Sequence, residues 1–294
     1  TKALLPFLKN VDPDLGALKD YITFQLCLGG KTMFQYINQL EPGHYMTISA
    51  SGTNIKKYWD VTFEPDFSRS EDSFIKELKE ILKDSISENL ISDVPIGAYL
   101  SGGYDSSAIA SIANVLNNKN DLIGFTGKFS KYGSRFDESS YAREVALNGK
   151  FEIKELEITS QNFLDNIQKV IYHLDYPVAG PGSFSQFMIS EYASKHRKVV
   201  LGGQGGDEIF GGYTRYLIAY FEQCIKSAIN GTSKNGDFVV TYESIIPNLQ
   251  ALKNYTPLLK QFWSEGLFDD MNKRYFSLIN RAPNLSGYVN WDML

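Results

Sequence analysis

The chain has 294 residues, which allows one large domain or two smaller ones, and its 43% hydrophobic content suits a protein with a buried core. The net charge of -5, without any cluster of lysine and arginine, argues against general nucleic-acid binding. The apolar runs are far shorter than a membrane span, and the first residues do not resemble a signal peptide, so we expect no membrane partner.

Cysteine and histidine give no sign of a metal site. Cys27 and Cys224 lack the spacing of a metal or redox motif, so we expect reduced thiols of a cytoplasmic protein. His44, His173 and His196 are scattered along the chain and are expected to be structural.

The first sixty residues are expected to form a separate piece. Residues 20–26 and 43–48 are expected to be strand-like or of mixed character, and residues 51–54 are typical of a hairpin turn. A linker follows at residues 64–68. A helix is then expected to begin near Ser70, because serine is a favoured N-cap and acidic residues follow it.

Strands and helices alternate from residue 94 onward. Strands are predicted at residues 94–100, 122–126, 151–158 and 198–201. Helices are predicted after Asp105, after Asp137, around residues 163–171 and at residues 183–196. This alternation predicts an α/β fold in which a doubly wound parallel sheet carries helices on both faces. Beyond Asp207 the chain is expected to be helical as far as residue 291.

A glycine- and serine-rich run, residues 99–107, lies between an expected strand and an expected helix. A strand-to-helix turn of this kind presents backbone N–H groups to an anion. Gly102 and Gly103 lack side chains, so a phosphate can approach the main chain, while Asp105 can cap the helix or face a metal. Because no lysine follows the glycines, the run is not a Walker-type loop. The alternative is a capped helix after a glycine turn that binds no ligand.

A second glycine-rich run, residues 202–213, follows the strand that ends at Leu201. It also places acidic residues at a helix start, at the sheet edge where doubly wound folds bind ligands. The two runs can therefore share one nucleotide.

The first run resembles the pyrophosphate loop of the ATP pyrophosphatase superfamily, whose pattern is Ser-Gly-Gly-x-Asp-Ser. The second run resembles the Ser-Gly-Glu-Gly-x-Asp-Glu-x-Phe-Gly-Gly-Tyr motif of glutamine-hydrolysing asparagine synthetases. Three further phrases, residues 92–95, 40–45 and 58–60, are similar to that family as well. The resemblance implies that residues 1–64 are the C-terminal remnant of an N-terminal nucleophile glutaminase domain. Residues 65–294 would be the synthetase domain, with a helical C-terminal part.

The chemistry that this resemblance implies begins with MgATP bound between the two loops. A carboxylate of aspartate attacks the α-phosphorus, pyrophosphate leaves, and ammonia from glutamine then displaces AMP from the acyl-adenylate. A homodimer is compatible with the family.

The resemblance also assigns residues to this chemistry. Adenine would meet Tyr99 and Gly127, the catalytic residues would be Gln204 and Asp207, and the magnesium ligands would be Asp105 and Asp207. The pyrophosphate and the rest of the nucleotide would lie along Ser101, Gly102, Gly103, Asp105, Ser106, Ser107, Gly202 and Gly203.

Several positions depart from the family pattern. The family glutaminase uses an N-terminal cysteine, whereas this chain starts with Thr1, which we take as the end of a fragment. The family continues past Leu294, so we expect the synthetase domain to be truncated at its C-terminus. Gln204 replaces a glutamate linked to adenylation, Gly202 replaces a serine and Tyr104 replaces a leucine.

Two alternatives follow from these departures. One is a relative with the same loops that forms an amide from another carboxylic acid. The other is a catalytically impaired homologue that binds nucleotide in a regulatory or scaffolding role.

Overall fold

The computed structural model describes residues 1–66, 68–117, 121–133, 137–175, 181–231, 256–264, 266–285 and 287–294. It divides into two compact units. Unit 1 comprises Thr1–Asp66, Ile171–Ala179 and Ile218–Leu294, and unit 2 comprises Phe67–Val170 and Gly180–Leu217. The sequence-based division into residues 1–64 and 65–294 stays a prediction. In the described part of the chain, no helix combines the length and apolar character that crossing a bilayer requires.

Unit 1 begins with a short 3₁₀ turn, a helix and a β-hairpin. These are η1 (Lys2–Phe7), α1 (Leu15–Phe24), β1 (His44–Ser49) and β2 (Gly52–Lys57). The hairpin strands pair antiparallel with Ser49 opposite Gly52, which confirms the strand at 43–48 and the hairpin, but the turn lies at residues 50–51, and residues 52–54 of the expected turn belong to β2.

The expectation of strand-like structure at residues 20–26 is wrong. The run Tyr21-Ile22-Thr23-Phe24 has high β-propensity, but it lies in α1, whose N-cap is Asp14. The Asp14 carboxylate accepts a hydrogen bond from the Ala17 N–H at 2.8 Å, and Ala17 is fully buried. Gln25, with φ 64°, ends the helix in the left-handed region.

The C-terminal helices of unit 1 are held by a buried ion-pair cluster. α8 (Thr214–Ile229) runs from unit 2 into unit 1, where α11 (Thr256–Phe262), α12 (Met271–Ile279) and η4 (Trp291–Met293) also lie. Glu222 on α8 accepts hydrogen bonds from the Arg274 guanidinium of α12, with Nη2 to Oε2 at 2.7 Å, and its Oε1 lies 2.9 Å from Lys226 Nζ. Expected helical structure is thus confirmed at α8, α11 and α12, whereas residues 266–270 and the described residues of 280–290 are turns and coil, and residues 232–255 lie outside the described residues.

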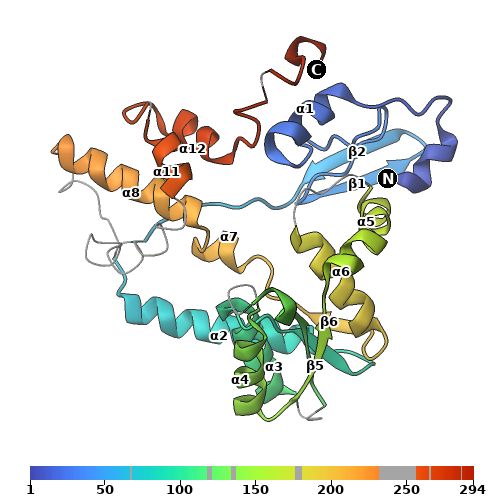
Figure 1. Cartoon of the computed structure of the whole chain (residues 1–294), viewed down its shortest axis with the longest axis vertical. Helices are drawn as coiled ribbons and strands as arrows, with labels where there is room; N and C mark the ends of the chain where they lie inside the picture. The colour runs from blue at the N-terminus through green and yellow to red at the C-terminus, as the bar shows by residue number, and fades with distance from the viewer. Residues whose placement is uncertain are drawn as a thin grey trace. The chain divides into compact units, whose positions relative to one another are not determined.

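Unit 2 is built on a four-stranded parallel sheet (Figure 1). Its strands are β3 (Ile96–Tyr99), β4 (Ile123–Lys128), β5 (Glu152–Glu157) and β6 (Val199–Leu201), in the spatial order β5-β4-β3-β6. Each strand falls within or beside its predicted range. The predicted α/β fold with a parallel sheet is therefore confirmed.

Helices cover both faces of this sheet, as predicted. They are α2 (Glu71–Asn89), α3 (Tyr104–Leu116), α4 (Ser139–Gly149), α5 (Ser160–Leu174) and α6 (Pro181–Ser194), with the short α7 (Gly206–Phe210) and the 3₁₀ turn η2 (Ser130–Tyr132). On one face, alanines of α3 and α4 pack with Leu100 and Leu122. On the other face, Ile189 and Ala193 of α6 pack against Ile123 and Phe125. Successive strand residues point to opposite faces, which explains this division.

The N-cap of α2 is the predicted Ser70, whereas the N-cap of α4 is Glu138, one residue after the predicted Asp137. The Ser70 hydroxyl accepts from the Ser73 N–H at 3.3 Å, so α2 begins where it was predicted. The Asp137 carboxylate accepts from the Ser139 N–H at 3.0 Å, at the start of α4. Burial is the largest single influence and raises the pKa of Asp137, but the hydrogen bonds with Ser139 and the Phe129 backbone, together with the charge of Arg143, outweigh it and leave that pKa lowered.

The strand order places a change of direction beside β3. From β3 the chain moves through α3 and α4 to β4 and β5, and then returns through α5 and α6 to β6 on the other side of β3. The loops after β3 and β6 therefore start side by side, at the carboxyl ends of two neighbouring parallel strands whose crossover connections run in opposite directions. Such a switch point is where open α/β sheets bind ligands.

Candidate functional site

The loop after β3 is closed by hydrogen bonds among its own serines. Ser106 Oγ accepts from the Ser101 N–H at 3.2 Å and donates to the Gly103 carbonyl at 3.2 Å. Ser101 Oγ lies 2.9 Å from Ser106 Oγ and accepts from the Gly103 N–H at 3.3 Å. The loop is thus preorganised, with Ser101 and Gly103 on its exposed side.

Gly102 and Ser107 belong to the same loop but face α4. A Cβ at Gly102 would lie 2.7 Å from Tyr141 Cβ, and its φ of 90° also requires glycine. Both residues line a cavity of about 430 Å³ on the α4 side. Ser107 Oγ is buried and, in the described part of the chain, has no hydrogen-bond partner.

The loop after β6 packs closely on the first loop. A Cβ at Gly203 would lie 2.8 Å from the backbone nitrogen of Ser106, so only glycine allows this approach. Gly205, with φ 98°, turns the chain into α7, and Gly211, with φ 68°, turns it out again. Tyr213 follows the turn that comes after α7.

The hydroxyl of Tyr213 donates to Glu208 Oε1 at 2.5 Å. This hydrogen bond lowers the pKa of Glu208 and raises the pKa of Tyr213. The guanidinium carbon of Arg215 lies 3.7 Å from the centroid of the Tyr213 ring. These contacts hold the chain segment that follows α7 against Glu208 of that helix.

The two loops line one cavity of about 590 Å³. Its walls come from β3, the two loops, the first turn of α3, α6 and α7. The lining residues are Tyr99, Ser101, Gly103, Tyr104, Asp105, Ser106, Gln186, Gly203, Gln204, Gly206, Asp207, Phe210 and Gly212. Most of the sequence-predicted site residues are therefore brought together, although these roles stay predictions.

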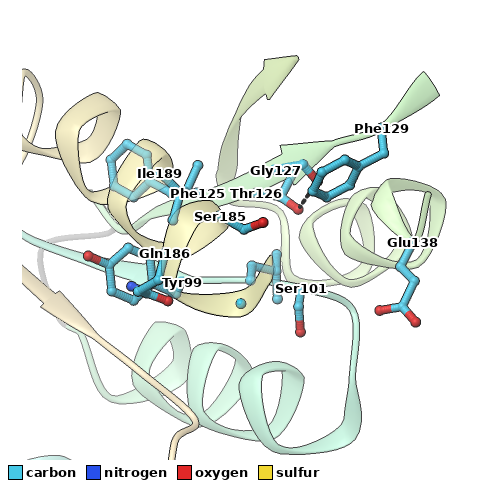
Figure 2. A pocket seen from close by; sticks show the side chains of 12 residues that line it. Tyr99, Ser101, Phe125, Thr126, Gly127, Phe129, Glu138, Ser185, Gln186 and Ile189 are labelled. Carbon is cyan, nitrogen blue, oxygen red and sulfur yellow. Dashed lines mark hydrogen bonds between the residues drawn. The ribbon is translucent and has the colours of Figure 1, made fainter. Parts of the chain in front are cut away.

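A second cavity of about 210 Å³ lies beside the ends of β3 and β4. Figure 2 shows Tyr99 and Gln186 at one end of it, and Phe129 and Glu138 at the other. Gly127, one of the predicted adenine contacts, lines this cavity together with apolar atoms of Phe125 and Ile189. Its apolar lining with a few polar groups suits a flat heteroaromatic ring.

Tyr99 and Gln186 line both cavities and belong to one polar chain. The Tyr99 hydroxyl lies 2.7 Å from Ser190 Oγ, which accepts from Gln186 Nε2 at 3.3 Å. Gln186 Oε1 in turn accepts from Gln204 Nε2 at 3.3 Å. Of the predicted residues, Gly202 lines neither cavity but lies under the Gln204 side chain.

The sequence did not point to the cavity residues on α6 or to the cavity residue just before α4. Gln186 and Ser185 lie within a helix predicted only from its apolar spacing, and Glu138 lies just before α4. Their approach to the site depends on how α6 crosses the sheet, which a single sequence does not report.

Carboxylates supply the acidic groups of the larger cavity. Asp105 and Asp207 both line it, whereas no group of three or more histidine, cysteine or acidic residues with metal-binding geometry occurs among the described residues. Mg²⁺ is bound in proteins through one or two carboxylates together with substrate phosphates and water. The donor set therefore fits a magnesium ion carried by a phosphorylated ligand.

The comparison with protein families agrees with these motifs. The model of the family described as asparagine synthase matches residues 77–286, which include both loops and both carboxylates. This chain belongs to the asparagine synthase family.

Individual curated proteins are similar to this chain over part of their length. The glutamine-hydrolysing asparagine synthetase 1 of Bacillus subtilis is 33% identical over 216 residues, 73% of this chain but 33% of that protein. The amidase chry2 of Gibberella zeae is 27% identical over 202 residues, 63% of this chain and 30% of that protein. The chain thus spans about a third of the length of these curated relatives.

Among solved structures, the NH3-dependent NAD synthetase of Campylobacter jejuni matches with a TM-score of 0.37 and 19% identity. The match covers 68% of this chain and 93% of that one. A likeness of this size adds no argument about the site.

Proposed function

We propose that this chain is the nucleotide-binding part of a ligase, an ATP-dependent synthetase that converts a carboxylic acid into an amide. One observation carries the proposal. In a member of the asparagine synthase family, two glycine-rich loops at the β3/β6 switch point line a single cavity that contains Asp105 and Asp207. Anions bind such loops through backbone N–H groups, and the cavity is large enough for a triphosphate and an acid.

The proposed binding mode divides ATP between the two cavities. The adenine would lie in the 210 Å³ cavity against Tyr99 and Gly127, because its walls are largely apolar. The phosphates would lie along Ser101, Gly103 and Ser106, in a loop whose shape is already held by hydrogen bonds from the Ser101 and Gly103 N–H groups to serine hydroxyls. Binding energy is then used for positioning rather than for ordering the loop.

The proposed reaction activates the acid before nitrogen attacks it. A carboxylate oxygen of the acid forms a bond to the α-phosphorus while the bond to pyrophosphate breaks, which gives an acyl-adenylate. Ammonia then adds to the acyl carbon, and AMP leaves with the former carboxylate oxygen. Mg²⁺ held by Asp105 and Asp207 would supply charge neutralisation on the phosphates.

The acceptor we propose is aspartate, and the nitrogen source is ammonia released from glutamine in the whole protein. Both follow from the family resemblance of the motifs and the junction phrase at residues 40–45. A homodimer and a cytoplasmic location belong to the same proposal.

A second candidate function is amide formation on a different acid, or nucleotide binding with impaired catalysis. It is favoured by one observation, that Gln204 occupies the position of a glutamate in the family motif. Its amide is hydrogen-bonded to Gln186 and lies at the wall of the larger cavity. A neutral amide cannot accept a proton or carry the charge that a glutamate would bring.

The deciding experiment uses the full-length protein with ATP, Mg²⁺, ammonium and a panel of carboxylic acids that includes aspartate. We expect acid-dependent release of equal amounts of pyrophosphate and AMP. If aspartate is the only acid of the panel that causes this release, the first function is supported. If another acid causes it, the second function is supported. If ATP yields ADP and phosphate instead, the ligase proposal is wrong, because cleavage must occur between the α- and β-phosphates.

A further inference from the structure

The second loop contains two kinds of glycine. Gly205 and Gly211 have positive φ angles, 98° and 68°, and nothing lies within 4 Å of a Cβ added at either. Gly206 and Gly212 are the opposite case. Neither has a positive φ, but the space that a side chain would occupy is taken. The first pair is required for the turns, and the second pair is required for a close approach.

Each glycine of the second pair lies against one carboxylate. A Cβ at Gly206 would overlap the carboxyl group of Asp105, with Oδ1 only 2.8 Å away. A Cβ at Gly212 would overlap Asp207 Oδ1 and lie 3.1 Å from its Cγ. The two carboxylates touched in this way are the two that line the larger cavity.

We propose that Gly206 and Gly212 are positioning residues for magnesium binding, because each leaves the space in which Asp105 or Asp207 lies. This inference rests on the proposed function, in which Mg²⁺ reaches the site with ATP. A methyl group at either position displaces one carboxylate from the cavity wall while leaving both acids in the sequence.

The packing around Asp105 explains why the loop cannot simply move away. Asp105 lies in the first turn of α3, and Gly203 holds the second loop against the Ser106 backbone at the same place. An added methyl group at Gly206 would therefore displace the short Asp105 side chain, which moves more easily than the backbone around it. Binding groups must be held to within about 0.5 Å of their productive geometry, so a displaced carboxylate loses its ligand role.

Thermal unfolding of double variants tests the steric part. In an ordinary helical position, alanine in place of glycine stabilises the fold. We therefore expect Gly206→Ala to lower the unfolding midpoint of the parent but to raise it in an Asp105→Ala background. Gly212→Ala should cost less stability in an Asp207→Ala background than in the parent, without a change of sign, because the added Cβ still lies 3.2 Å from the Asp207 Cα.

Gly287 offers a matched control, because it has no positive φ and nothing within 4 Å of an added Cβ. Gly287→Ala should shift the midpoint equally in every background. If Gly206→Ala lowers the midpoint by the same amount with and without Asp105, the assigned contact is wrong.

Calorimetric titration of ATP, with Mg²⁺ and with EDTA, tests the magnesium part. We expect Mg²⁺ to tighten ATP binding to the parent and to Gly287→Ala. Gly206→Ala should lose at least tenfold of this enhancement and keep the affinity measured in EDTA. Full enhancement in Gly206→Ala overturns the inference but leaves the proposed function standing. A parent that binds no ATP in either buffer overturns the proposed function and the magnesium role, while the unfolding data still decide the contact.

Discussion

Gly202 and Gln204 are sterically coupled. The Gln204 side chain lies over Gly202, where a Cβ would overlap its Oε1 and come within 3.2 Å of Cδ. In this conformation Gln204 Nε2 donates to Gln186 Oε1 at 3.3 Å. The family motif has serine and glutamate at these two positions, so the two departures in this chain are connected through one contact. A substitution at 204 should therefore be judged together with residue 202.

Replacing Gly202 by serine should move the Gln204 side chain without unfolding the protein. The overlapping atom is the far end of a flexible side chain, so another rotamer relieves the contact at little cost. We expect a crystal structure of Gly202→Ser to show the Gln204 amide away from Gln186, with an unfolding midpoint close to that of the parent. An unchanged hydrogen bond between Gln204 and Gln186 in that structure would contradict the steric coupling.

Replacing Gln204 by glutamate should restore a function that the family links to adenylation. A carboxylate at this position supplies charge or accepts a proton, and such an interaction typically changes a rate by on the order of a hundredfold. We expect Gln204→Glu in the full-length protein to raise aspartate-dependent pyrophosphate release, and the double variant with Gly202→Ser to raise it further.

The control for this prediction is Gln186→Glu, which puts a carboxylate beside the same site but not on the second loop. It should not raise the aspartate-dependent rate. No gain in either Gln204→Glu protein, combined with release by another acid in the parent, would favour the changed-substrate function.

Asp105→Ala should weaken binding of MgATP by at least tenfold, because it removes a carboxylate that lines the larger cavity. Calorimetry with Mg²⁺ present measures the effect. Asp84 on α2 is exposed and outside both cavities, so Asp84→Ala controls for the loss of one negative charge. Equal affinities of the Asp105→Ala protein and the parent would show that Asp105 is not part of the magnesium site.

The sequence predicted the sheet and the two loops because local signals agree with the fold there. Leu100 is a fully buried residue before the first loop, and Ser70 is a favoured cap that does cap α2. The strand expected around Tyr21 is wrong because the run lies in a helix, where the cap at Asp14 and the burial of Ala17 count for more than local β-propensity. Gln186 could not be predicted, since its place between the cavities follows from the crossing of α6 over β4.

Within the loops, the sequence could not separate the glycines by role. Gly102 was expected to admit a phosphate, yet the space that a Cβ would take at Gly102 is filled by Tyr141 of α4. Gly206 was expected only as part of a glycine-rich motif, yet it lies against Asp105. The sequence shows where glycine has no side chain, but only the structure shows which neighbouring atoms occupy the space that a side chain would take.

The buried cluster of unit 1 gives a prediction about stability. Glu222 is 1% exposed and faces two cations, with Lys226 Nζ 2.9 Å from its Oε1 and Arg274 Nη2 2.7 Å from its Oε2. Glu222→Gln keeps the shape but leaves both cations without their carboxylate. Breaking a buried pair in this way costs about 3–5 kcal/mol in the free energy of unfolding. Denaturant titration at pH 7 measures the loss.

The pH dependence of that loss has a defined sign. Burial alone raises the pKa of Glu222, but the hydrogen bonds from Arg274 and Lys226 outweigh it and leave the pKa below its ordinary value of 4.5. A carboxyl with a lowered folded-state pKa stabilises the fold above its unfolded-state pKa and loses this contribution as the pH falls through the folded-state value. The difference in unfolding free energy between the parent and Glu222→Gln should therefore be constant near neutral pH and shrink below about pH 4.5.

Glu77, which pairs with Arg69 and is half exposed, provides the matched control. Glu77→Gln should change stability little at any pH, because exposed pairs contribute little. A loss in Glu222→Gln that persists unchanged at pH 3 would mean that the charge of Glu222 is not what stabilises the contact between α8 and α12.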